Sequence, residues 1–342
     1  MKLFCYNPRV NSISPWASAS AALILLALTG CGGNPRPGFP IAQKRGTGAD
    51  RDNAAPSTGG IRYTLRAEKT WQLNLPNGER FDASGLLLTP EGDLLTVSDR
   101  GSSLYQIQFQ ENTNAANLLL LPKLFTREQM AGPAGENLSR FDVEGIGRDE
   151  QGRLYICEES HRWIFRADPR PDQVELLKID WSPVQKYFDA VDLNASFEGV
   201  AAGKGRLYVA NERQRCRIIV VDLKTLGIID DFSVRPSASH ARDLHYSDLC
   251  WFDDALFVLL RESRCVLKID PESHRVLVEY NFSEMESGPE VLYRTRYPTG
   301  TMEGLAVDPE FIWVVTDNNG LGRVRYPRDL RPTLFKCRRP DR

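Results

Sequence analysis

From residue 61 onward, short apolar runs alternate with polar turns instead of following a helical period. The runs at 154–156 and 312–315 are typical, since β-branched and aromatic residues dominate them and favour strands. The turns between such runs carry Gly, Asp, Asn or Pro, which favour chain reversals. No long amphipathic helical pattern interrupts them, and only 127–130 is expected to form a turn of helix. The pattern therefore predicts an all-β fold.

Five segments of this region can be aligned with one another. Each reads as an apolar strand, a polar turn and a second apolar strand, and their first residues lie 60, 54, 50 and 55 positions apart. The segments begin at Ser84, Glu144, Glu198, Asp248 and Glu303. A four-stranded repeat of this length is typical of a β-propeller, because a closed ring of such sheets buries faces that one sheet leaves exposed. The alternative is a β-sandwich with coincidental internal similarity.

The two ends of this region favour a closed ring. The last repeat has room for about three strands if 332–337 forms the third, and 62–75 is able to supply the missing outer strand. That pairing would tie the N-terminal strand to the C-terminal blade. The prediction is five visible four-stranded blades, with a sixth, degenerate blade left open in 102–143 or 284–302.

Acidic residues recur at both ends of the aligned hairpins. A second residue lies 14 positions after the first in each repeat, which gives the pairs Glu144–Glu158, Glu198–Glu212, Asp248–Glu262 and Glu303–Asp317. In the first repeat Ser84 reaches Ser98, and Asp99 lies beside it. Because the first strand of a propeller blade lines the channel, we expect these carboxylates to converge near the axis on one face.

Converging carboxylates repel one another unless positive charge lies among them. One candidate is a hard cation such as Ca²⁺, which binds oxygen ligands. The candidate metal ligands are Glu144, Glu158, Glu198, Glu212, Glu262, Glu303 and Asp317. The other source of positive charge is arginine. A separate set of residues is expected to bind the ligand. These candidate ligand-binding residues are Asp99, Arg100, Arg261, Arg264 and His161. The alternatives are a structural network in which each acid caps backbone N–H groups and, for His161, an exposed loop histidine.

Composition excludes several kinds of site. The 342 residues include 43 Lys and Arg against 45 Asp and Glu, a net charge of −2 that argues against a nucleic-acid partner. The four His are scattered and no C-x-x-C pair occurs, so neither a histidine-rich nor a zinc-type site is expected. No G-x-S-x-G elbow, G-x-G-x-x-G or Walker-type loop is present. Of the five later cysteines, Cys216 and Cys265 hold near-equivalent positions and are the first candidate disulfide pair.

The N-terminal sixty residues carry targeting signals. Lys2 and Arg9 precede a small and apolar run at 16–28, as in a secretory signal. At about 13 residues the run is shorter than the roughly 20 that a spanning helix needs, which argues against the alternative of a transmembrane anchor. The run ends Leu-Thr-Gly-Cys31, which resembles the bacterial lipoprotein box and implies lipidation of Cys31. We therefore expect a signal peptide at 1–30, the lipidated Cys31 and a flexible tether at 31–60, and the propeller at 61–342.

The motifs resemble, in order, the family described as esterase-like activity of phytase. They are Phe81-Asp-Ala-Ser-Gly, Ser98-Asp-Arg-Gly, Asp142-Val-Glu-Gly, Glu158-Glu, Phe197-Glu-Gly-Val-Ala, Asn211-Glu-Arg, Ser247-Asp-Leu, Leu259-Leu-Arg-Glu-Ser, Met302-Glu-Gly-Leu-Ala and Thr316-Asp-Asn-Asn. The resemblance covers about residues 62–338 and implies a secreted or periplasmic propeller, with an enzymatic activity that it defines only loosely. The fourth repeat departs from the pattern, since Asp248 lacks the Gly that follows the acid in other repeats.

Two functions stay open. The first is a phytase-like, Ca²⁺-dependent hydrolase of a phosphoester or related ester, in which the acids hold the cation and arginines hold the anionic group. Few lysines lie near the motifs, which counts against a polyphosphate substrate. The second is a non-catalytic propeller that binds a small anionic ligand or an envelope protein, because fold does not decide function. In both cases we expect an outer-membrane lipoprotein facing the periplasm, held to the lipid membrane through acylated Cys31.

Overall fold

A computed structural model describes residues 60–122, 124–135, 141–168, 173–189, 191–192, 195–212, 216–237, 244–295 and 300–342. The chain divides into two compact units, Met1–Arg51 and Asp52–Arg342. All described residues belong to the second unit, so the expected signal peptide and Cys31 lie outside them. Within the described part, no helix combines the length and the apolar character needed to cross a membrane.

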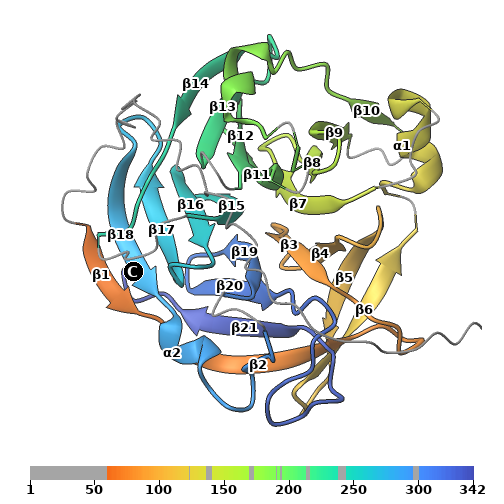
Figure 1. Ribbon diagram of the computed structural model, residues 1–342, viewed down its shortest axis with the longest axis vertical. Coiled ribbons are helices and arrows are strands. Elements are labelled where there is room, and N and C mark those ends of the chain that lie inside the picture. Colours follow the sequence, from red (N-terminus) through yellow and green to blue (C-terminus); the bar gives the residue numbers. More distant parts are fainter. Residues whose placement is uncertain are drawn as a thin grey trace, which may run out of the picture. The chain divides into compact units, whose positions relative to one another are not determined.

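The described strands form five blades around one axis, and the strands of each blade follow one another outward from the channel (Figure 1). The first blade holds β3 (Ala83–Leu88), β4 (Leu94–Ser98), β5 (Leu104–Phe109) and β6 (Ala115–Leu121). The second holds β7 (Val143–Arg148), β8 (Leu154–Glu158), β9 (Trp163–Ala167) and β10 (Val174–Leu176). The third holds β11 (Phe197–Gly203), β12 (Arg206–Asn211), β13 (Arg217–Asp222) and β14 (Ile228–Phe232). The fourth holds β15 (Tyr246–Phe252), β16 (Ala255–Leu260), β17 (Cys265–Asp270) and β18 (Arg275–Asn281).

The N-terminal strand completes the fifth blade. That blade holds β19 (Met302–Val307), β20 (Phe311–Thr316) and β21 (Thr333–Arg338), and its outer strand is β2 (Ala67–Asn74), which pairs antiparallel with β21. Alternate residues of β2, Trp71 and Leu73, are buried, as expected of a strand with one face on the core. β2 also runs parallel to β6 over three residues, and β1 (Ile61–Thr64) adds a parallel strand to β18. The predicted closure of the ring is confirmed.

Inner strands of neighbouring blades contact one another in the order β3, β7, β11, β15, β19 and back to β3, so the ring is closed by five blades. The five buried core clusters of the described residues lie one at each blade interface. No sixth blade occurs in the described parts of 102–143 and 284–302. The first contains β5, β6 and α1 (Arg127–Ala134), and the second contains the end of α2 (Ser283–Glu286). A 3₁₀ helix, η1 (Ser182–Tyr187), follows the second blade.

The glycine that follows the first acid allows the inner strands to approach closely. A Cβ atom on Gly199 would lie 2.7 Å from the Cα of Asp248 in the next blade, and one on Gly145 would lie 2.8 Å from the Cα of Gly199. Real Cβ atoms essentially never come closer than 3.0 Å to such atoms. The Glu-Gly pattern therefore reflects the packing of blades around a narrow axis.

Strand pairing corrects the sequence alignment in the fourth blade. Tyr246 pairs with Leu260 and Asp248 with Leu259, so Ser247 is the residue left out of the ladder at the bulge. Ser247 is therefore the equivalent of the first glutamate of the other blades, and Asp248 takes the place of their glycine. The sequence comparison matched acid to acid and was shifted by one residue.

The fully buried carboxylate of Asp248 joins three inner strands. Its Oδ2 accepts hydrogen bonds from the backbone N–H of Leu305, at 2.7 Å, and of Leu86, at 3.3 Å. Burial raises the pKa of Asp248 well above its usual value, although these N–H groups lower it. This side chain therefore has a structural role in the channel.

The five cysteines of the described residues are all free. The candidate pair of Cys216 and Cys265 therefore does not form a disulfide. Burial raises the pKa of both thiols. Cys265 packs as a small apolar group, and the Cys216 thiol donates to the backbone carbonyls of Glu212 and Leu244.

Candidate functional site

A β-bulge places one residue of each inner strand at the same level of the ring. The pairing register shifts by one residue at this point in every blade, for example between Phe197 and Gly199, which leaves Glu198 at the bulge. We call these five residues the bulge ring: Ser84, Glu144, Glu198, Ser247 and Glu303.

A second ring is formed by the residue that directly follows the second strand of each blade. The pairing of Phe197 with Asn211, for instance, makes Glu212 the member from the third blade. We call these residues the strand-end ring: Asp99, Glu159, Glu212, Arg261 and Asp317. Four of the five positions carry a carboxylate, and the fourth blade carries an arginine instead.

The two rings enclose a pocket of about 220 Å³ on the propeller axis. Its lining comprises Ser84, Asp99, Asp142, Glu144, Glu159, Glu198, Glu212, Arg261, Glu303, Asp317 and Asn319. The structure thus brings together seven of the residues that the sequence singled out, namely Asp99, Glu144, Glu198, Glu212, Arg261, Glu303 and Asp317. The lining holds eight carboxylates and one guanidinium, and we call it the axial acidic pocket.

Two candidate ligands from the sequence lie just outside this lining. The buried carboxylate of Glu158 accepts hydrogen bonds from the backbone N–H of His161 at 2.8 Å and of Asp142 at 3.3 Å, and it contacts the His161 Nδ1 at 3.0 Å. Glu262 contacts Nδ1 of His245 at 2.9 Å. Both carboxylates therefore hold the loops that surround the pocket.

The other basic candidates do not line the pocket either. Arg264 pairs with Glu286 at 2.9 Å and lines a separate pocket of about 240 Å³. The exposed Arg100 lies 3.7 Å from the buried Asp82. His161 stacks on Trp163, with ring centroids 4.2 Å apart.

Sequence reasoning missed Glu159 and Asp142 as lining residues. In the first two blades the hairpin is one residue longer, so the inward acid lies 15 and not 14 positions after the bulge residue. Asp142 stands two residues before Glu144, and Asp82 holds the same place before Ser84. The adjacent acids of Glu158-Glu159 and the repeated position of Asp142 were the available signals.

Arg261 is held by carboxylates from three directions. Its Nη2 donates to Oε1 of Glu212 at 2.7 Å, its Nη1 to Oε1 of Glu303, and its Nε lies 3.3 Å from Oε1 of Glu262. Burial alone would lower the pKa of Arg261, but the charges of Glu198 and its other acidic neighbours raise it instead. Arg261 therefore neutralises the side of the pocket formed by the third, fourth and fifth blades.

The carboxylates on the other side of the pocket are poorly compensated. Burial, followed by the charges of Asp317, Asp82 and Asp142, raises the pKa of Asp99 to about 8. Burial likewise raises the pKa of Glu144 well above its usual value, with Asp142 and Glu159 adding to the effect. On the side that Arg261 compensates, burial still raises the pKa of Asp317 to about 6, although the charges of Arg261 and Arg80 lower it. The shifts of Asp99 and Glu144 therefore reflect burial first and the crowding of negative charge second.

The donor set fits a hard cation. Two groups of carboxylates place ligand oxygens within 4.8 Å of one another, and they share Glu159: Asp142, Glu144 and Glu159, then Glu159, Glu198 and Glu212. Oε2 of Glu303 and Oδ1 of Asp99 are buried and have no hydrogen-bond partner among the described residues. The lining offers carboxylate oxygens and no Cys or His, which suits Ca²⁺ or Mg²⁺ and does not suit zinc or copper.

These observations define a five-bladed β-propeller with an acidic pocket on its axis. The model of the family Phytase-like, described as esterase-like activity of phytase, matches residues 82–320. The match covers more than two thirds of the chain, and the chain belongs to this family. The resemblance carried by the sequence motifs is confirmed.

One solved structure supports the fold, and a second is weakly similar. Glutaminyl cyclase from Myxococcus xanthus is 14% identical, and the alignment covers 82% of this chain and 98% of that chain with a TM-score of 0.53. The PQQ-bound aldose sugar dehydrogenase from Streptomyces coelicolor is 13% identical over 80% of this chain and 98% of that chain, with a TM-score of 0.42. At 14% identity the likeness to the glutaminyl cyclase is one of fold. No curated protein sequence matches the chain.

Proposed function

We propose that the axial acidic pocket binds a divalent, oxygen-liganded cation, Ca²⁺ by preference, and that the protein is a cation-dependent hydrolase of a phosphoester or related ester. The observation that carries the proposal is the crowding of eight carboxylates around one arginine. So many buried negative charges are costly to hold together unless a cation offsets them. The family to which the chain belongs supports an ester as the substrate class.

The cation would lie around Glu159, the carboxylate that the two close groups share. Asp142, Glu144 and Glu159 approach one another there, and Glu198 and Glu212 join through Glu159. Arg261 already compensates Glu212 and Glu303. When bound, Ca²⁺ supplies the positive charge that offsets these acids and polarises an ester oxygen of the substrate.

The pocket's own residues would make substrate binding depend on the cation. An anionic ester that enters the pocket alone meets carboxylates on nearly every side, and the guanidinium of Arg261 is already occupied by acids. Asn319 donates its side-chain N–H to Asp317 at 2.6 Å and keeps that carboxylate in place. We therefore infer that the substrate's anionic group binds together with the cation and not to Arg261 alone.

The alternative is a non-catalytic propeller that uses the same pocket to bind a small anionic ligand or an envelope protein. The occupied state of Arg261 favours this alternative, because the lining then offers no free cationic side chain to the reacting group. Both functions require a cation in the axial acidic pocket, but only the hydrolase turns over an ester substrate.

One experiment separates them. Protein stripped with a chelator is assayed with and without Ca²⁺ against phosphomonoesters, phosphodiesters and carboxylic esters, beside Glu159→Gln and the matched control Glu158→Gln. Catalysis predicts Ca²⁺-dependent turnover that falls at least about tenfold in Glu159→Gln and persists in Glu158→Gln. Ca²⁺ binding without turnover on any ester supports the binding alternative, and absence of both disproves the function proposed.

We further propose that the protein is anchored in the bacterial envelope through acylated Cys31. The support is the apolar run at 16–28 followed by Leu-Thr-Gly-Cys31. Radioactive palmitate labelling of cells that express the protein or Cys31→Ser tests this. Label in the first and none in the second is expected, and equal labelling would contradict the anchor.

A further inference from the structure

Two loops of the fifth blade form one surface on the propeller. Residues 321–331 belong to the connection between β20 and β21, and residues 288–295 follow α2. The backbone N–H of Val324 donates to the carbonyl of Leu292 at 2.7 Å, and that of Arg294 donates to Gly322 at 3.0 Å. We call these residues, 288–295 and 321–331, the fifth-blade loop surface.

This surface exposes apolar side chains. Leu292, Val324, Tyr326 and Leu330 have exposed fractions of 40%, 45%, 46% and 40%. Scattered exposed apolar residues are ordinary, but several gathered on two adjoining loops mark a surface that meets a partner.

The same surface is basic on an acidic domain. Its two segments carry five arginines, one glutamate and one aspartate, a net charge of +3. Residues 60–342 together hold 37 of the 43 basic and 43 of the 45 acidic side chains, a net charge of −6. The positive charge is therefore concentrated against the overall sign of the domain.

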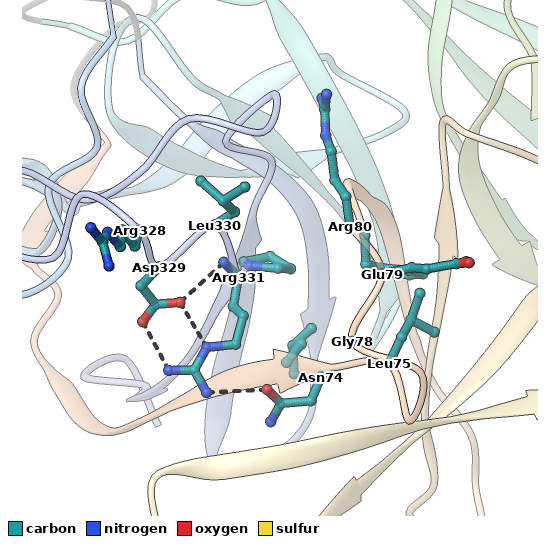
Figure 2. A pocket seen from close by; sticks show the side chains of 12 residues that line it. Asn74, Leu75, Gly78, Glu79, Arg80, Arg328, Asp329, Leu330 and Arg331 are labelled. Carbon is teal, nitrogen blue, oxygen red and sulfur yellow. Dashed lines mark hydrogen bonds and ion pairs between the residues drawn. The ribbon is translucent and has the colours of Figure 1, made fainter.

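Figure 2 shows a pocket of about 240 Å³ that residues 328–331 of this surface line together with residues 73–75 and 78–81. Arg331 is fixed there by Asp329, at 2.7 Å and 2.8 Å, and by Asn74 at 3.1 Å. Arg328 is exposed and makes no ion pair or hydrogen bond with the described residues. Leu330 lies between these arginines in the chain, and Asp329 and Glu79 add acidic groups to the lining.

We propose that the fifth-blade loop surface docks onto a lipid bilayer that carries anionic phospholipids. Tyrosine, arginine and aliphatic side chains presented together suit the interface, where the ring and the aliphatic groups enter the headgroup region and the arginines meet phosphates. Charge complementarity favours this occupant, since an anionic bilayer matches the local +3 and not the −6 of the domain.

The length of chain before the propeller agrees with this occupant. Residues 32–60 number 29, and the flexible tether expected from the sequence would have a root-mean-square span of about 30 Å. A lipid on Cys31 would thus hold the domain within reach of the same membrane. The docking itself needs neither the lipid nor the axial acidic pocket.

The test uses residues 60–342, which contain every strand of the closed ring. The protein is sedimented with phosphatidylcholine vesicles that contain or lack phosphatidylglycerol, at low and high salt. We expect binding to the anionic vesicles only, and loss of that binding at high salt because the attraction between charges is screened.

Tyr326→Ser with Arg328→Glu is expected to reduce the bound fraction at least about fivefold. The matched control, Ile229→Ser with Lys224→Glu, changes one exposed apolar and one exposed basic residue near the turn between β13 and β14 and is expected to bind as the parent does. Circular-dichroism melts check that both variants fold, and Tyr326→Ser alone replaces the double variant if it does not. Equal binding to neutral vesicles, an unaffected loop variant, or a dimer in the ultracentrifuge that the loop variant abolishes would each overturn the proposal.

Discussion

Nη2 of Arg261 donates to Oε1 of Glu212 at 2.7 Å, although the two residues hold equivalent positions in neighbouring blades. The fourth blade thus supplies a cation where the other four supply a carboxylate. This single exchange divides the axial acidic pocket into a compensated side and an uncompensated side. The uncompensated side is where we place the divalent cation.

Arg261→Ala removes the internal counter-charge. We expect the chelator-treated protein to lose about 3 kcal/mol of unfolding free energy, because the variant leaves buried carboxylates without their partner. Ca²⁺ should restore part of that loss and should bind more tightly than in the parent. Urea titrations with and without Ca²⁺ measure both effects. A variant as stable as the parent in chelator would contradict the role given to Arg261.

Stability of the metal-free protein should fall as pH rises. The pKa of Asp99 is raised to about 8 and that of Asp317 to about 6, so the folded state holds protons that the unfolded state has released. The stabilisation is complete below about pH 4, the unfolded value, and is lost progressively up to about pH 8. The urea midpoint in chelator should therefore be lower at pH 8.5 than at pH 5, with a smaller difference in Asp99→Asn.

Calcium should reverse this loss at high pH. A ligand that binds only the folded state adds about 2.7 kcal/mol at one hundred times its dissociation constant. The midpoint at pH 8.5 should rise when Ca²⁺ is added and should stay unchanged with Na⁺ at the same ionic strength. If Na⁺ raised the urea midpoint as much as Ca²⁺ does, the stabilisation would come from screening of charges by salt and not from Ca²⁺ binding.

Gly199→Ala tests the close approach of the inner strands. The new Cβ would overlap the backbone of Asp248, and we expect a loss of about 1–3 kcal/mol from overpacking. Gly132→Ala is the control, because Gly132 lies in α1 with no atom within 4 Å of the added Cβ. That substitution should be neutral or stabilise by up to about 1 kcal/mol. Thermal melts compare the two, and equal effects would refute the packing argument.

Trp71→Ala tests the closure of the ring. Trp71 is 5% exposed and its ring lies 4.5 Å from that of Phe109 and 6.1 Å from that of Trp313, which come from the first and fifth blades. Removal should cost about 3–5 kcal/mol. Val324→Ala, on an exposed loop of the same blade, should cost much less. A small effect of Trp71→Ala would mean that β2 does not hold the ring together.

The five-bladed architecture could be predicted from the sequence because it depends on local periodicity. The segments at 62–75 and 332–337 were enough to predict the closing strands, and the spacing of Glu198 and Glu303 predicted acids on one face. The acids recur from blade to blade, so an error in the alignment of one blade is corrected by the others.

The details of the site were not within reach, because they depend on register. Glu158 and Glu159 are equally acidic in the sequence, but a hairpin one residue longer turns Glu159 toward the axis and leaves Glu158 to hold the His161 loop. In the fourth blade, matching acid to acid put Asp248 in the place that Ser247 holds. Arg261 and Glu212 come from different blades. Residue spacing within one repeat does not predict a contact between two repeats, so this pairing could not be found from the sequence.

Ca²⁺ titration in a calorimeter tests whether the axial acidic pocket binds the cation. Chelator-stripped parent protein, Glu159→Gln and Glu158→Gln are titrated side by side. We expect Ca²⁺ to bind the parent saturably and to bind Glu158→Gln as it binds the parent. The affinity of Glu159→Gln for Ca²⁺ should be lower by about ten- to a hundredfold. Folded parent protein that takes up no Ca²⁺, or a Glu159→Gln variant that binds as the parent does, would contradict cation binding in this pocket.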